Sequence, residues 1–288
     1  MRPTATIPTL LLALSPLAAS GQETIRFKEI GRTTEKEINV VLSSSFGTVI
    51  LNRGESGKVV TAEAGDGTES SRMSVDYSIR NRVGYLETTL GDVQKDDEGK
   101  HSFSLKGFER GKWYLKFTDA LPISFDIQLG VGRGDFNLSG LQVKDFNLTS
   151  GASDVTLAFD EPNATTIDNI TIESGLSKFD GRNLGNARFK HLRFQGGVGS
   201  YTLDFSGDLR SEVDVDVEVG LGVLTIYIPR AVGARISYEQ SWASRIDCDR
   251  DFEPTDESSF TSSNYGSASG KMNVRIDSGL GSIKIRRR

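Results

Sequence analysis

The sequence predicts an all-β protein: a parallel, β-helix-like solenoid with coils of about 22 residues and a more irregular β cap at its N-terminal end. Three observations predict this fold. Helical periodicity is nearly absent after Ser20. Apolar and polar residues alternate along most of the chain, as they do in half-buried strands. A short motif centred on two small residues recurs seven times, with nearly constant spacing in the middle of the chain.

Residues 1–20 have the features of a secretory signal peptide. Arg2 supplies a positive charge, residues 10–17 form a short apolar core, and small residues follow it up to Ser20. The core is far shorter than the ~20 residues of a membrane-spanning helix. We therefore expect cleavage after Ser20 and a mature chain without a transmembrane segment. Its location would be the periplasm, the cell surface or the extracellular space.

Residues 21–120 are predicted to form the cap. One copy of the motif lies here, centred on Ser45, and polar loops are expected near residues 65–71 and 92–100. An open solenoid end exposes core and strand edges, so a cover of shorter strands, some of them antiparallel, is expected. Further strand patterns occur at 73–79, 84–90 and 113–117. Aromatic residues before the array could form a hydrophobic cap or a platform for sugars: Phe103, Phe108, Trp113, Tyr114 and Phe117.

Residues 121–288 are predicted to form the solenoid array. The motif has the form Φ-x-Φ-x-x-G-Φ-[GS]-x-Φ-x-Φ, where Φ is apolar and the first small residue is the anchor. From Gly130 to Gly220 the anchors recur at a nearly constant interval, which suits one coil of two or three short strands. The anchors are Ser45, Gly130, Gly151, Gly175, Gly197, Gly220 and Gly279.

Aligning the copies on their anchors gives columns of apolar residues. Parallel stacking at ~4.8 Å would place equivalent residues side by side and pile these columns into a continuous interior. The column three residues before the anchor is Leu42, Ile127, Leu148, Ile172, Phe194, Val217 and Ile276. The column four residues after the anchor is apolar except at Gly134. The column directly after the anchor is Phe46, Val131, Ala152, Leu176, Val198, Leu221 and Leu280, and it is also expected inside.

The intervening columns should point outward. The column two residues before the anchor is Ser43, Gln128, Thr149, Glu173, Gln195, Glu218 and Asp277. Three residues after the anchor, Arg133, Asp154 and Lys178 should form a ladder of alternating charge. Arg193 and Asp216 should likewise be neighbours. A β-sandwich of hairpins is the alternative fold, although it does not require the same motif at constant spacing.

The small-Φ-small centre should turn the chain through a corner, because glycine permits positive φ or a close backbone approach. Between the last two anchors, Gly220 and Gly279, the spacing more than doubles. A loop excursion is therefore predicted at about 243–270, with an acidic part at 247–257. The motif then returns at 273–285 and ends in the basic tail Arg286, Arg287 and Arg288.

Known catalytic and metal-binding patterns are not found. The sequence contains no G-x-S-x-G, P-loop or H-E-x-x-H motif, and its two histidines, His101 and His191, lack partners at metal-ligand spacing. Cys248 is the only cysteine, so it cannot form an internal disulfide. Two acidic clusters lack calcium-loop spacing: Asp96, Asp97 and Glu98, and Asp247, Asp249, Asp251 and Glu253. We predict no catalytic, cofactor-binding or metal-binding residue and no cofactor.

Three segments resemble the toast-rack family of bacterial envelope proteins: FDIQLGVGRGDFNLSG at 125–140, VDVEVGLGVLTIYIPRAVGARI at 215–236 and VRIDSGLGSIKI at 274–285. They are also similar to the C-terminal domain of LiaF-like stress regulators and to adhesin-like (DUF4097-like) β-solenoids. The resemblance implies a solenoid of the cell envelope without catalytic residues to carry over. LiaF-like proteins usually have transmembrane helices before this domain, so their membrane-signalling role does not transfer.

Two functions from different classes remain open. The first is a non-catalytic exported envelope protein with a binding, scaffold or adhesin-like role. The second is a polysaccharide lyase or hydrolase on a β-helix scaffold, which a groove with two or more carboxylates and a basic neighbour would favour. The formal net charge of −5 argues against nucleic acid as a partner. An envelope polysaccharide or another envelope protein is the expected partner, and the oligomeric state is left open.

Overall fold

The computed structural model describes residues 26–65, 73–91, 111–239 and 244–288, so the predicted signal peptide lies outside them. Within these ranges the strands form one 16-stranded sheet, accompanied by a single 3₁₀ turn, η2 (Leu184–Ala187). No described helix is long and apolar enough to cross a membrane. The predicted all-β solenoid with parallel coils is confirmed.

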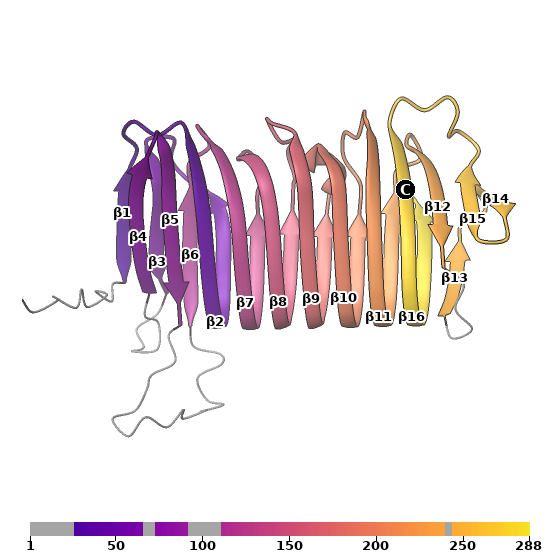
Figure 1. Cartoon of the computed structure of the whole chain (residues 1–288), viewed down its shortest axis with the longest axis horizontal. Helices are drawn as coiled ribbons and strands as arrows, with labels where there is room; N and C mark the ends of the chain where they lie inside the picture. The colour runs from indigo at the N-terminus through magenta and orange to yellow at the C-terminus, as the bar shows by residue number, and fades with distance from the viewer. Residues whose placement is uncertain (1–25, 66–72, 92–110, 240–243) are drawn as a thin grey trace, which may run out of the picture.

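Seven long strands build the regular part of the molecule. Each pairs in parallel with its neighbours along nearly its whole length. Figure 1 shows that each strand runs down, bends, and returns behind itself, so that every coil is one U-shaped strand. We call the part before the anchor the front limb and the part after it the back limb. The strands are β2 (Glu37–Arg53), β7 (Pro122–Asn137), β8 (Gln142–Ala158), β9 (Ile167–Arg182), β10 (Phe189–Asp204), β11 (Glu212–Ile228) and β16 (Lys271–Arg287).

The bend needs glycine because adjacent coils touch there backbone to backbone. Gly222 has a φ of +146°, and a Cβ placed on it would lie 1.9 Å from the carbonyl oxygen of Gly199 in the preceding coil. A Cβ on the anchor Gly220 would lie 2.8 Å from the carbonyl oxygen of Gly197. Both reasons expected for glycine, positive φ and close approach, therefore operate at the bend.

The core is a flat layer between the front and back limbs. Ile172, Phe194 and Val217 are paired in register on consecutive coils and are at most 1% exposed. On the back limb, the column four residues after each anchor is also buried and faces these front-limb side chains. The exception at Gly134 has a packing reason, because a Cβ there would lie 2.7 Å from Phe136 Cζ and 2.9 Å from Leu129 Cδ1. These larger side chains fill the space that the missing one leaves.

The column directly after the anchor is not inside, which corrects the sequence-based prediction. Its members Val131, Leu176, Val198, Leu221 and Leu280 are between 39% and 66% exposed. The strict alternation of inward and outward side chains holds only along an extended strand. At the bend the chain reverses, so a side chain at the tip of the U points away from both limbs.

The N-terminal end is covered by shorter strands, some of them antiparallel, as expected. The front limb of β2 pairs with β5 (Val83–Leu90) and its back limb with β6 (Lys112–Phe117). Antiparallel strands then extend both limbs. On the front side β4 (Met73–Arg80) pairs with β5. On the back side β3 (Lys58–Ala64) pairs with β6, and β1 (Phe27–Gly31) pairs with β3. Of the predicted aromatic cluster, Trp113 and Phe117 on β6 are fully buried within this cap and Tyr114 is half-buried, whereas Phe103 and Phe108 lie outside the described residues.

The C-terminal end differs from the predicted loop at about 243–270, because this segment contains strands. β12 (Gly233–Tyr238) and β13 (Ser244–Cys248) pair with the two limbs of β16. A hairpin of β14 (Phe252–Asp256) and β15 (Ser259–Ser262) extends β12. These edge strands are short: β13 and β14 carry charged residues, and β14 also carries Pro254. With one or two apolar residues each, β13, β14 and β15 do not show the alternation that reveals an interior strand in the sequence.

Candidate binding face

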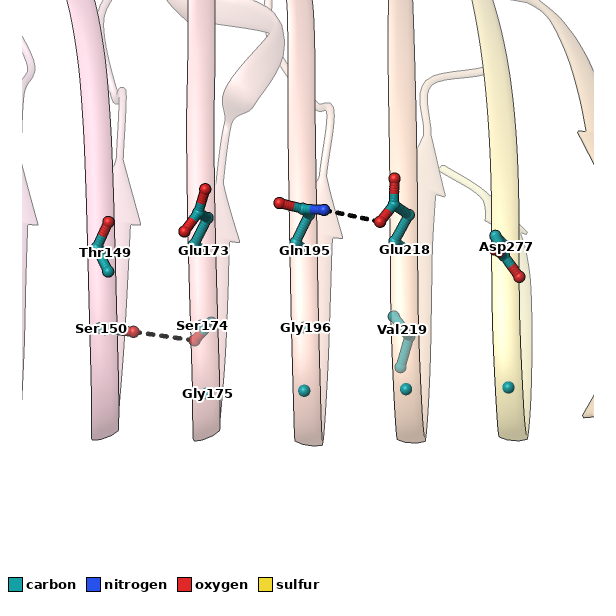
Figure 2. Close-up of a pocket in the computed structure, with 13 residues that line it drawn as sticks. Thr149, Ser150, Glu173, Ser174, Gly175, Gln195, Gly196, Glu218, Val219 and Asp277 are labelled. Carbon is teal, nitrogen blue, oxygen red and sulfur yellow. Dashed lines mark hydrogen bonds between the residues drawn. The ribbon is translucent and has the colours of Figure 1, made fainter.

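A groove of about 690 Å³ crosses the front limbs of β8, β9, β10, β11 and β16 just before their bends. The groove exists because the anchors of these coils are glycines, which have no side chains, whereas the column two residues before the anchor carries polar side chains. Figure 2 shows these earlier side chains as a row across the strands. The row consists of Thr149, Glu173, Gln195, Glu218 and Asp277.

The register of the sheet sets the spacing of this row. Glu173 pairs with Gln195, Gln195 with Glu218, and Glu218 with Asp277, so neighbours are ~4.8 Å apart. Gln195 Nε2 donates a hydrogen bond of 2.7 Å to Glu218 Oε2, and Arg193 Nη2 donates one of 2.9 Å to Glu218 Oε1. These bonds link Arg193, Gln195 and Glu218 at the centre of the row.

The floor of the groove is fixed by buried hydroxyl groups. Ser150 Oγ and Ser174 Oγ are 3.0 Å apart on neighbouring strands, and Ser174 Oγ lies 2.5 Å from Ser177 Oγ at the bend. Both Ser150 and Ser174 are 4% exposed. The groove therefore has a floor of hydrogen-bonded strands and a wall of polar side chains.

The groove has some features of an enzyme and lacks others. Three carboxylates, Glu173, Glu218 and Asp277, line it, and Arg193 is a basic neighbour, as the enzyme hypothesis required. A proton-donating carboxyl in a glycosidase normally sits in an apolar enclosure. Glu218 is instead 47% exposed, and both of its oxygens accept hydrogen bonds. Within the described ranges, no three His, Cys, Asp or Glu side chains are placed to hold a metal ion.

Below the groove runs an exposed apolar ridge that sequence reasoning had assigned to the core. The bends carry one apolar side chain each, aligned in register across six coils. We call this set the bend ridge: Val131, Ala152, Leu176, Val198, Leu221 and Leu280. Contiguous exposed apolar surface on a folded protein is typical of an interaction site.

The predicted outward ladders are confirmed by the strand pairing. Arg133 pairs with Asp154, their charged groups lie 3.7 Å apart, and Asp154 pairs with Lys178. Arg193 and Asp216 are also register partners, although the ion pair of Arg193 is made with Glu218. These exposed pairs contribute only ~0.2–1 kcal/mol each to stability.

The remaining polar candidates have structural roles or lie outside the described ranges. His191 is exposed, with its Nδ1 3.5 Å from Asp214 Oδ2. His101 and the cluster of Asp96, Asp97 and Glu98 lie outside the described residues.

The second acidic cluster pairs with Arg286 and Arg287 of the basic tail, whereas Arg288 pairs with Asp204. Asp247 Oδ2 lies 2.5 Å from Arg286 Nη2, and Asp249 Oδ2 accepts a hydrogen bond of 2.7 Å from the backbone N–H of Arg287. The guanidinium of Arg287 is buried and donates to the carbonyl oxygen of Val232 at 2.9 Å. Burial lowers the pKa of Arg287.

Cys248 lies at the end of β13, half-buried against the core. Burial, with a smaller contribution from the negative charge of Asp247, raises the pKa of the Cys248 thiol to about 12. Since the thiolate is the reactive form, a thiol reagent at pH 8 should modify the native protein about a thousandfold more slowly than the unfolded protein. Stopped-flow or timed labelling with and without denaturant measures this ratio. Equal rates would show that the thiol is freely exposed.

U-shaped coils stacked in one parallel sheet around a flat core define the class of toast-rack β-solenoids. A family model described as "N-terminal domain of toast_rack, DUF2154" matches residues 19–180, which is more than half of the chain. The chain therefore belongs to the toast-rack family. A crystal structure of a "putative cell adhesion protein" from Clostridium sporogenes ATCC 15579 is similar, with a TM-score of 0.48 and 18% identity over 92% of this chain and 100% of that chain. No curated protein matches.

Proposed function

We propose that the protein is a non-catalytic component of the bacterial cell envelope that binds its partner through the front face. The observation that carries the proposal is the row of polar side chains repeated at strand spacing along an open groove. Such a row offers many weak and equally spaced contacts, which add up for an extended polymer or for another sheet. Membership of the toast-rack family supports the envelope setting.

An exported location follows from the signal-peptide features of residues 1–20, and the place of action is the periplasm or the cell surface. An envelope polysaccharide and another envelope protein are the partner classes that fit the face. The second candidate function, a polysaccharide lyase or hydrolase, is favoured by the three carboxylates of the groove. The exposure of Glu218 and the openness of the groove favour binding over catalysis.

Binding and cleavage assays on envelope polysaccharides and envelope extracts separate these functions. We expect no cleavage by the wild-type protein. Glu173→Gln, Gln195→Ala and Glu218→Gln should each weaken binding by about two- to fivefold, because each removes one of many polar contacts. The matched control is Asp135→Asn, an exposed carboxylate on the back limb of β7. Cleavage that one carboxylate substitution abolishes, while binding persists, would establish an enzyme instead.

A further inference from the structure

A second cavity, of about 510 Å³, lies between the starts of β10 and β11, at the end of the coils opposite the bends. In Figure 1 this is the upper end of the molecule, where loops connect successive coils. The cavity shares no lining residue with the groove of the front face. Its volume is in the usual range for a pocket that binds one small molecule.

The cavity exists because β10 and β11 separate at their first residues. Near its start β10 has two exposed residues in succession, Lys190 and His191, whereas exposed and buried residues alternate in β11 from its first residue. The ladder between these strands begins only at His191 and Asp214, although β10 pairs with β9 from Phe189 onward and β11 with β16 from Glu212 onward. Relative to β11, β10 thus has one extra residue, and such bulges end strand pairing and often lie beside functional sites.

The floor of the cavity is apolar, and the loops around it are tied to each other. Phe189, Leu209 and Val213 line it and are at most 9% exposed. Above them, the buried Asn186 accepts a hydrogen bond of 2.9 Å at Oδ1 from the backbone N–H of Asp208, and its Nδ2 donates to a backbone carbonyl of the loop after β8. These bonds fix the β10–β11 loop to the loop of the preceding coil, so the cavity is formed by the fold itself.

Two arginines of the lining have hydrogen-bond donors to spare. Arg188 Nη1 donates to the carbonyl oxygen of Asn163 at 3.2 Å, and Arg210 Nε donates to Asp208 Oδ1 at 2.6 Å. Within the part of the chain that the structure describes, neither guanidinium group makes a further hydrogen bond. Arg188 also has a left-handed backbone, with a φ of +57°, which is uncommon for residues other than glycine. A guanidinium group binds a carboxylate or a phosphate through two parallel hydrogen bonds.

The lining also supplies hydrogen-bond acceptors. Glu212 Oε1 accepts a hydrogen bond of 3.0 Å from Asn273 Nδ2, and Asn273 Oδ1 accepts one of 2.7 Å from the hydroxyl of Tyr265. This chain of bonds orients the Glu212 carboxylate and leaves its Oε2 without a partner among the described residues. Asp208 Oδ2 is likewise without one there. Carboxylate oxygens of this kind accept hydrogen bonds from hydroxyl groups.

We propose that this cavity binds one acidic sugar residue, that is, a monosaccharide unit with a carboxylate or a phosphate group. The acid group lies against the guanidinium groups of Arg188 and Arg210, and the sugar hydroxyls donate to Asp208 and Glu212. The less polar face of the ring covers the apolar floor. A neutral sugar leaves the arginine donors without an anion, and a sugar without hydroxyls near the carboxylates leaves these unpaired. The proposal goes beyond the proposed function, because it concerns other residues at the other end of the front limbs.

Titration with monosaccharides tests the ligand class. Glucuronate, glucose 6-phosphate and glucose present a carboxylate, a phosphate and a neutral group on the same ring. In a nuclear magnetic resonance titration, at least one of the two acids should bind about tenfold more tightly than glucose, and the tighter one identifies the acid group. The amide signals of Leu209 and Arg210 should move, whereas that of Glu173 in the front groove should not. Equal binding of all three sugars, or no binding of either acid at ~10 mM, would overturn the proposal.

Substitution of the arginines tests their role. Arg188→Gln and Arg210→Gln should each weaken binding of the acid about tenfold, and Arg210→Lys should weaken it as well, because lysine keeps the charge but lacks the planar pair of donors. Lys190→Gln should have a smaller effect, since Lys190 Nζ already lies 2.7 Å from Asp168 Oδ1. The matched control is Arg133→Gln, which removes an exposed arginine at the opposite end of a coil. Acid binding that survives both glutamine variants, or that the control weakens equally, contradicts the proposal.

Filling the cavity tests its location without a change of charge. Ser211→Trp places a bulky side chain in the lining and should abolish binding of the acid, whereas Ser200→Trp, on the exposed back limb of β10, should not. Unchanged denaturation midpoints show that the variants are folded. Full acid binding by Ser211→Trp would place the ligand elsewhere and refute the site.

This proposal and the proposed function can fail separately. Glu173→Gln in the front groove should leave binding of the monosaccharide acid unchanged, and Arg210→Gln should leave binding at the front face unchanged. A protein that binds its envelope partner in the graded manner described, but binds neither acid, would retain the proposed function and exclude the sugar site.

Discussion

Replacement of Phe194 by alanine should lower the free energy of unfolding by about 3–5 kcal/mol. The Phe194 ring is fully buried, and its centroid lies 5.2 Å from that of Phe179 and 5.1 Å from that of Tyr201. Truncation to alanine removes the apolar surface that the Phe194 ring buries and leaves a cavity in the thin core between the front and back limbs. Chemical denaturation of the purified variant gives the change in the free energy of unfolding from the midpoint and slope of the transition.

The control for this prediction is Asp216→Ala, on the outward face of the next coil. Asp216 is exposed, and its substitution should cost less than ~1 kcal/mol. Similar shifts of the denaturation midpoint in the two variants would show that the inward and outward columns are wrongly assigned.

Replacement of Gly222 by alanine should destabilise the protein by at least about 3 kcal/mol. The backbone at this bend has a φ of +146°, which an L-residue adopts only with strain, and the added Cβ would lie 1.9 Å from the carbonyl oxygen of Gly199. The neighbour is backbone held in the strand ladder, so the two coils have to move apart. Thermal and chemical unfolding of the variant measure the loss.

Gly266→Ala is the matched control, since nothing lies within 4 Å of a Cβ placed there. The same chemical change at this open position should leave stability within ~0.5 kcal/mol of the wild type. A Gly222→Ala variant as stable as the Gly266→Ala variant would mean that the bends are not packed backbone to backbone.

The sequence predicted the parts of the fold that depend on repetition. Aligned anchors give the strand register directly, because parallel coils stack equivalent residues. The pairing of Phe194 with Ile172 and Val217 follows from that alignment alone. The outward ladder of Arg133, Asp154 and Lys178 follows in the same way.

Two features could not be predicted from the sequence for physical reasons. Apolar residues at the bends match the pattern of core residues, so only the three-dimensional turn shows that Leu176 is 66% exposed. The groove arises from the missing side chains of the anchors next to a polar column, and a sequence pattern does not show such a hollow. Strands β13, β14 and β15 were missed because they are only four or five residues long and have one or two apolar residues each, too few to show the alternation of an interior strand.

The position of β16 constrains the order in which the molecule can be completed. β16 follows β12–β15 in the chain but lies between β11 and β12 in the sheet. The edge of β11 therefore stays unpaired during synthesis until the segment after β15 has been made. When β16 inserts, it forms ladders with β11, β12 and β13 at once. The C-terminal end of the molecule, from β12 to β16, thus assembles by closure of a gap rather than by addition of coils one after another, and this step should be slow and cooperative.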